Sequence, residues 1–134
     1  MLGSALGGTV PRMRAQAESM MTDTCTIARL TTVWNEALQK SETTWAPVHT
    51  GLSCWVEVPS VTAQALLTAE VVTPETPTVH LPVDTTDVAP DDRVTVTAVG
   101  PVSDPGLVDA VLWVTHSLAQ TFAVERLLVC RWTR

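Results

Sequence analysis

The chain has 134 residues, 46% of them hydrophobic, and a formal net charge of -6 at pH 7. This length fits one domain, and the apolar share excludes a largely disordered protein. Direct nucleic-acid binding is disfavoured, because phosphate recognition needs clustered cations and the eight Lys and Arg residues are scattered. No apolar run reaches the roughly 18 residues of a transmembrane helix, and residues 1–9 lack the basic start of a signal peptide. We therefore expect a soluble protein.

The N-terminal region is predicted to be a flexible, glycine-rich tail over residues 1–9, followed by a short helix over about residues 11–22. Pro11 suits the first turn of that helix. Helical spacing places four small or apolar residues on one face: Met13, Ala17, Met20 and Met21. This face either packs on the chain's own barrel or docks on a neighbouring subunit, for which flexible thioethers are well suited.

The first strand is predicted over residues 24–31, and a clearer one over residues 52–58. In the latter, Leu52, Cys54 and Val56 alternate with more polar positions. Residues 33–42 are ambiguous between a helical turn and a hairpin loop, and their polar second half favours the loop.

Residues 59–77 are predicted to form a long loop between strands. Part of it, residues 61–72, has the composition of a short helix, whereas Pro74 and Pro77 end any regular element. Long insertions in small barrels are uncommon unless they have a function. We therefore expect this to be the functional loop.

The second half of the chain reads as consecutive strands over residues 78–83, 93–99, 110–116 and 124–132. Val- and Thr-rich runs alternate with period two and are separated by segments rich in Pro, Asp and Gly. The predicted fold is mainly β: a small antiparallel β-barrel or sandwich that forms a single domain over residues 10–134.

No nucleotide-binding, zinc-protease or serine-hydrolase motif is present. Cys25, Cys54 and Cys130 are far apart and lie in apolar runs, which predicts three reduced, buried thiols. A nucleophile pair of His116 and Cys130 is conceivable if the last two strands pair, but Cys130 lies within a strand rather than at an electropositive helix start. We expect no enzymatic activity and no cofactor.

Four aspartates between two predicted strands raise the possibility of a calcium loop: Asp84, Asp87, Asp91 and Asp92. The spacing lacks the calcium-loop pattern and its downstream glutamate. Aspartates that initiate turns explain the segment more simply.

Five tryptophans accompany one Phe and no Tyr. Trp55 and Trp113 alternate with core-facing neighbours, so both are predicted to point outward, as side chains at interfaces often do. The alternative is a second small core beneath the N-terminal helix.

The order of elements resembles a known family. A short helix precedes the strand Asp23-Thr-Cys-Thr-Ile-Ala-Arg29, and Gly51-Leu-Ser-Cys54 enters the next strand before the long loop. Val79-His-Leu-Pro82, Asp92-Arg-Val-Thr-Val96 and a closing strand from Glu125 to Cys130 follow. This resembles the head-closure, or stopper, proteins among the head-to-tail connectors of tailed bacteriophages.

The resemblance implies a β-barrel in a ring of about twelve copies, below the portal and adaptor proteins and above a tail terminator or tail tube. Such a ring lies in the neck of the virion, retains packaged DNA without reading its sequence and needs no membrane. By position, the predicted channel residues lie in the long loop: Val61, Thr62, Leu66, Leu67 and Glu70. Open alternatives are another neck or tail ring such as a terminator, a small β-barrel hydrolase and an oligonucleotide-binding barrel.

Overall fold

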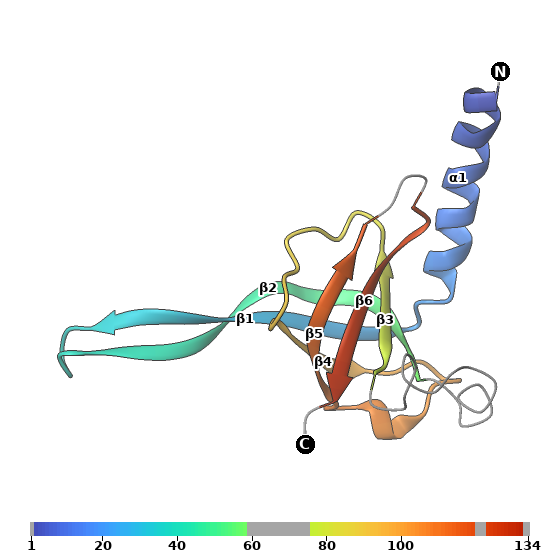
Figure 1. Cartoon of the computed structure of the whole chain (residues 1–134). Coiled ribbons are helices and arrows are strands. Elements are labelled where there is room, and N and C mark those ends of the chain that lie inside the picture. Colours follow the sequence, from blue (N-terminus) through green and yellow to red (C-terminus); the bar gives the residue numbers. More distant parts are fainter. Residues whose placement is uncertain (1, 59–75, 120–122, 133–134) are drawn as a thin grey trace.

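The computed structural model describes residues 2–58, 76–119 and 123–132, which form a helix, six strands and a short 3-10 helix (Figure 1). In chain order these are α1 (Leu2–Ser19), β1 (Asp23–Asn35), β2 (Lys40–Glu57), β3 (Thr78–Pro82), β4 (Arg93–Ala98), η1 (Pro105–Leu107), β5 (Val111–Leu118) and β6 (Glu125–Trp132). The predicted mainly β fold is confirmed. The predicted channel residues and nearly all of the 59–77 loop lie outside the described residues.

The six strands form one antiparallel sheet that closes into a barrel in the order β1-β2-β3-β6-β5-β4. Closure comes from the pairing of β4 with β1, which leaves the barrel wall without an exposed edge. Alternate residues of every strand point inside, as period-two alternation requires. The buried interior consists of Cys25, Ile27, Cys54, Val79, Leu81, Val94, Val96, Leu112, Val114, Leu128 and Cys130.

The first two strands, at 13 and 18 residues, are longer than the other four, which have five to eight. Their register shifts on both sides of Ile27, and each shift gives β2 one extra residue. Gly51, with φ of +61°, lies at the first of these bulges, in a conformation that glycine adopts without strain. Bulges bend and twist a strand pair, so the pair can leave the barrel wall here.

Beyond Ala28, β4 no longer pairs with β1, and the two long strands continue alone as a two-stranded ribbon. We call residues 29–46 the hairpin arm. Figure 1 shows it extending well outside the barrel. The predicted hairpin near residues 33–42 is therefore correct, but its turn covers only residues 36–39 and the strands are much longer than predicted.

Helix α1 begins at Leu2, so the prediction of a flexible tail over residues 1–9 and a helix starting near residue 11 is wrong. Pro11 lies inside the helix rather than in its first turn. An interior proline costs a helix about 3 kcal/mol but does not forbid it. α1 contacts β3 and β6, and Arg14 Nε donates to the carbonyl of Ala123 at 2.9 Å. The rest of the helix projects from the barrel (Figure 1).

The loop between β4 and β5 is tied to the start of β1. The buried Asp23 carboxylate accepts hydrogen bonds from the Gly100 amide, at 2.9 Å, and from the Ser103 hydroxyl. A side chain at position 100 would collide with Thr22, which explains the glycine there. No helix within the described ranges combines the length and hydrophobicity that crossing a membrane requires.

Candidate assembly surfaces

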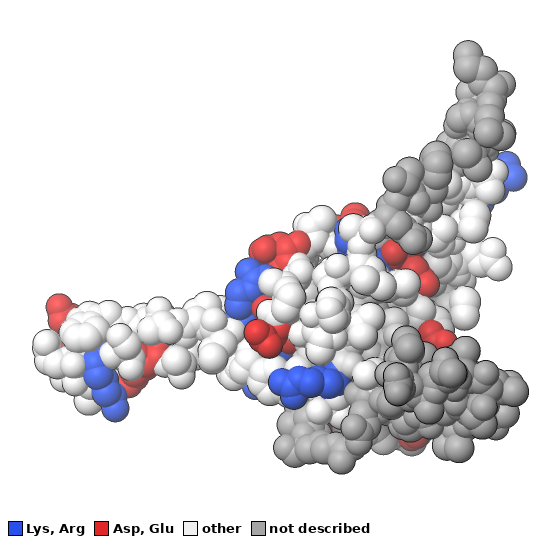
Figure 2. Space-filling view, viewed as in Figure 1, with Lys and Arg blue, Asp and Glu red and all other residues white. Residues whose placement is uncertain are grey.

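The hairpin arm exposes large apolar side chains instead of burying them. Leu30, Val33, Trp34 and Leu38 each keep 53–56% of their surface exposed. In Figure 2 most of the arm is uncharged, with charged side chains near its tip and at its root. A two-stranded ribbon is marginally stable on its own, and its exposed apolar groups make the arm a candidate surface for contact with a partner.

The tip of the arm is ordered by its own side chains. Trp34 Nε1 donates to Glu36 Oε2 at 3.2 Å, and the Leu38 amide donates to Asn35 Oδ1 at 3.1 Å. Gln39 adopts a positive φ of 51° and donates from Nε2 to the Glu36 carbonyl at 2.8 Å. These bonds hold Trp34 and Leu38 in a defined turn.

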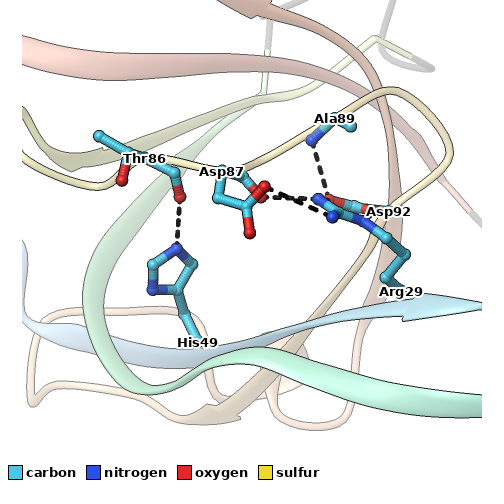
Figure 3. A network of polar contacts seen from close by, with 6 residues as sticks. All are labelled: Arg29, His49, Thr86, Asp87, Ala89 and Asp92. Carbon is cyan, nitrogen blue, oxygen red and sulfur yellow. Dashed lines mark hydrogen bonds and ion pairs between the residues drawn. The ribbon is translucent and has the colours of Figure 1, made fainter.

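The root of the arm is clamped to the loop between β3 and β4 (Figure 3). Arg29 donates to both carboxylate oxygens of Asp92, at 2.9 and 3.0 Å, and to the carbonyl of Asp87 at 2.7 Å. Asp92 is 1% exposed and also accepts from the Ala89 amide at 2.9 Å. The Asp92 carboxylate raises the pKa of Arg29 above its usual value, so this arginine stays charged.

A second contact of the same loop supports the clamp. His49, on β2, approaches the Thr86 carbonyl with Nε2 at 2.6 Å (Figure 3). Both strands of the ribbon are thus fixed to one loop where they leave the barrel. The clamp sets the direction in which the arm points.

Beside the arm's root, tryptophan and arginine side chains gather on the outer wall of the barrel. Trp45 meets Trp113 edge to face with ring centroids 5.3 Å apart. Arg93 lies over Trp45 at 4.2 Å from the ring centroid, and Arg131 lies over Trp113 at 5.5 Å. The predicted outward orientation of Trp113 is confirmed, but the ring is half-buried by these neighbours.

Another part of the barrel wall, where β3 lies between β2 and β6, carries an acidic cluster. His80 lies between two carboxylates, with Nδ1 2.8 Å from Glu125 Oε1 and Nε2 2.8 Å from Glu57 Oε2. Trp55 stacks on its ring with centroids 3.7 Å apart. Two carboxylates thus flank one imidazole on this part of the wall. Trp55 is thus outward-facing, as predicted, and half-buried against His80.

The predicted helical face divides into different environments. Met13 and Met20 are exposed, Ala17 is half-buried and Met21 is buried. The prediction of one shared face is wrong for Met21, because α1 ends at Ser19 and helical spacing does not reach it. Of the four, Met13 and Met20 remain candidates for a docking surface.

An open pocket of about 390 Å³ lies beside the connection from α1 to β1 and beside the end of β2. The arm is at the other end of the same two strands. Most of the pocket wall is apolar, and its polar lining consists of Thr22, Asp23, Ser103 and Asp104. The apolar lining consists of Met20, Trp55, Val56, Val58, Val102 and Leu107.

The residues considered for chemistry do not converge. His116 is exposed, whereas Cys130 is buried inside the barrel, where burial raises the pKa of its thiol to about 12. The predicted burial of Cys25, Cys54 and Cys130 is confirmed. Hydrogen bonding to Cys25 and burial also raise the pKa of the Cys54 thiol.

Three of the four aspartates have a clear structural purpose. Asp92 and Asp87 bind Arg29, and Asp87 and Asp91 occupy turn positions with φ of 62° and 72°. Within the described ranges, no three His, Cys, Asp or Glu side chains gather as a metal site would need. The turn interpretation of this segment is therefore the one that fits the geometry.

Sequence reasoning missed the arm residues Leu30, Trp34 and Leu38 and the clamp residue Arg29. The apolar side chains on both faces of residues 30–34 were the available signal, because an ordinary barrel strand has one polar face. Nothing local indicated Arg29, whose partner Asp92 lies 63 residues away.

Comparison with known proteins gives a family and a fold. The model of a family of unknown function, DUF6093, matches residues 13–131. No curated protein matches the chain. The solution structure of protein SF1141 from Shigella flexneri 2a is similar, with a TM-score of 0.63 and 19% identity over 84% of this chain and 92% of that chain. At this identity the likeness extends to the fold alone.

Proposed function

Since the chain belongs to DUF6093, a family of unknown function, we propose a function from its surfaces: it is a structural subunit that assembles with copies of itself into a ring. The observation that carries this proposal is the hairpin arm, which leaves the barrel with four large apolar side chains exposed. Exposed apolar side chains do not stabilise a monomer. When a partner covers them, the burial of their apolar surface stabilises the complex.

The arrangement of the protrusions supports a ring. The arm and α1 leave the barrel in different directions (Figure 1). A tryptophan–arginine surface lies near the arm, and an acidic cluster around His80 lies elsewhere on the barrel wall. Two unlike surfaces on one subunit suit heterologous contacts, which form a ring when the rotation from one copy to the next closes.

We further propose that this ring belongs to the neck of a tailed bacteriophage, in the head-closure position. The order of elements resembles that family, and a barrel with projecting arms suits a subunit that contacts neighbours, a portal or adaptor above and a tail component below. The ring would surround packaged DNA without reading its sequence and would carry out no chemical step.

Deletion of the gene from a phage genome that encodes this chain tests the proposal, with electron microscopy of the lysate as the readout. We expect complete tails beside heads that have lost their DNA. Joined, DNA-filled particles would overturn the neck assignment and favour a hydrolase or an oligonucleotide-binding barrel. Full heads with tails of abnormal length would indicate a tail terminator instead.

A further inference from the structure

The tip of the hairpin arm and the pocket are at opposite ends of the same two strands. β1 runs from the pocket, at Asp23, to the arm tip, at Asn35, and β2 returns along it. Thirteen strand residues span about 40 Å. The arm of one molecule therefore cannot reach its own pocket, but it points away from the barrel toward where a neighbour would lie.

We propose that the arm tip of one copy inserts Trp34 and Leu38 into the pocket of a second copy of this chain. This contact rests on the proposed self-assembly and names the surfaces that make it. The tip presents an indole and an isobutyl group that are both more than half exposed. The pocket, at about 390 Å³, is of the size that encloses small organic ligands, so it has room for an indole.

Charge complements the apolar fit. Lys40, the single lysine of the chain, begins β2 directly opposite Asn35 at the tip. Asp104 is one of the residues that line the pocket, and its carboxylate accepts a hydrogen bond from the Gly106 amide at 2.8 Å, which fixes its position. Glu36, the acidic residue of the turn, is occupied by Trp34 and Gln39 within its own tip. An inserted tip therefore brings a cation to a carboxylate.

The contact is heterologous, because the tip and the pocket are different surfaces. Each copy gives its arm to one neighbour and receives the arm of another, so the contact repeats in one direction around a ring. The clamp at Arg29 and Asp92 supports this, because an arm with a fixed direction loses less conformational entropy on binding than a free one.

Cross-linking between two variants that each carry one added cysteine tests the contact. Chains carrying Leu38→Cys and chains carrying Val102→Cys, with tags of different mass, are mixed and treated with a short bismaleimide. The native cysteines are buried and stay unmodified. We expect the heterodimer to exceed the two homodimers at least about fivefold, because the Leu38→Cys tip keeps Trp34, and burial of that indole in the pocket favours this pair over random encounters.

Two controls make the result specific. Trp34→Ala in the Leu38→Cys chain should return the heterodimer to the random level. Val108→Cys, exposed in the same loop but not lining the pocket, should give no excess. A heterodimer no more abundant than random pairing overturns the contact, and this is the expected result if another segment or another protein fills the pocket. Oligomers seen by sedimentation without that heterodimer would overturn only this contact and leave the proposed assembly standing.

Discussion

The barrel and the hairpin arm are built from the same two strands, but different forces hold the two regions. In the barrel half of β1, Cys25 and Ile27 are fully buried in a closed core. In the arm half, Leu30 and Trp34 are more than half exposed. Backbone pairing joins the two strands there, and the clamp fixes their root to the loop between β3 and β4. The barrel half is thus stabilised by the apolar surface that it buries. The arm half exposes its apolar surface, where we expect a partner to bind.

Truncating one leucine in each region should give the largest difference in stability between the barrel and the arm. Leu112→Ala removes a fully buried side chain from the barrel and should lower the free energy of unfolding by about 2–5 kcal/mol. Leu30→Ala removes the same group from the arm and should change the free energy of unfolding by less than about 0.5 kcal/mol. Urea unfolding followed by tryptophan fluorescence measures both. Equal losses would contradict the separation of core and arm.

The clamp joins the two regions, and breaking it should have an intermediate effect. Arg29→Gln leaves the buried Asp92 carboxylate without its cation, which should lower the free energy of unfolding by less than Leu112→Ala does and by more than Leu30→Ala does. It should also loosen the arm, seen as faster amide hydrogen exchange in residues 29–46 than in the barrel strands.

Arg12→Gln on the exposed side of α1 is the matched control, since it removes the same charge away from the clamp. Equal stability and exchange in the two variants would show that the Arg29–Asp92 pair does not fix the arm.

Alkaline pH should weaken the barrel through its buried thiols. The pKa of Cys130 is raised to about 12 in the folded state, against about 8.5 in an unfolded chain. Its stabilising contribution is complete below about pH 8.5 and is lost as pH rises toward 12, because the unfolded state releases the proton first. The unfolding free energy should fall by up to about 1.4 kcal/mol per pH unit for this thiol.

Urea unfolding at pH 7.5 and 9.5 measures that decline, which should be shallower in Cys130→Ala. Leu38→Cys provides the contrast in the arm: a thiol reagent should modify it in the native protein at neutral pH, while the native cysteines react only after unfolding. The same slope in Cys130→Ala and in the unsubstituted chain would contradict the assignment of the decline to this thiol.

The sequence predicted the barrel better than the arm, for a physical reason. The strands from β3 to β6 were predicted to within two residues of their ends, because each buries one face and so alternates with period two. Residues 29–46 bury neither face, and no alternation marks them. The beginning of α1 was missed because Gly7, Gly8 and Pro11 weaken a helix without preventing it.

The candidate surfaces were predicted only in part. Trp55 and Trp113 could be assigned to the outer face from their neighbours, and both lie there. The clamp and the pocket could not be found in this way, because each joins residues far apart in the chain. The pocket takes its lining from the end of α1, the end of β2 and the loop before η1.

Two tryptophans of the same long hairpin should differ in their effect on stability, and Trp34→Ala should have the smallest effect of all. Trp55 stacks on His80 at 3.7 Å, so Trp55→Ala should lower the free energy of unfolding by about 1–3 kcal/mol. Trp34 is exposed at the arm tip, so Trp34→Ala should change the free energy of unfolding by no more than about 0.5 kcal/mol. The same substitution should weaken association between copies. Urea unfolding and sedimentation at several concentrations separate the two quantities. If Trp34→Ala destabilised the monomer as much as Trp55→Ala, the tip would be packed within its own chain and could not be the surface that a neighbour receives.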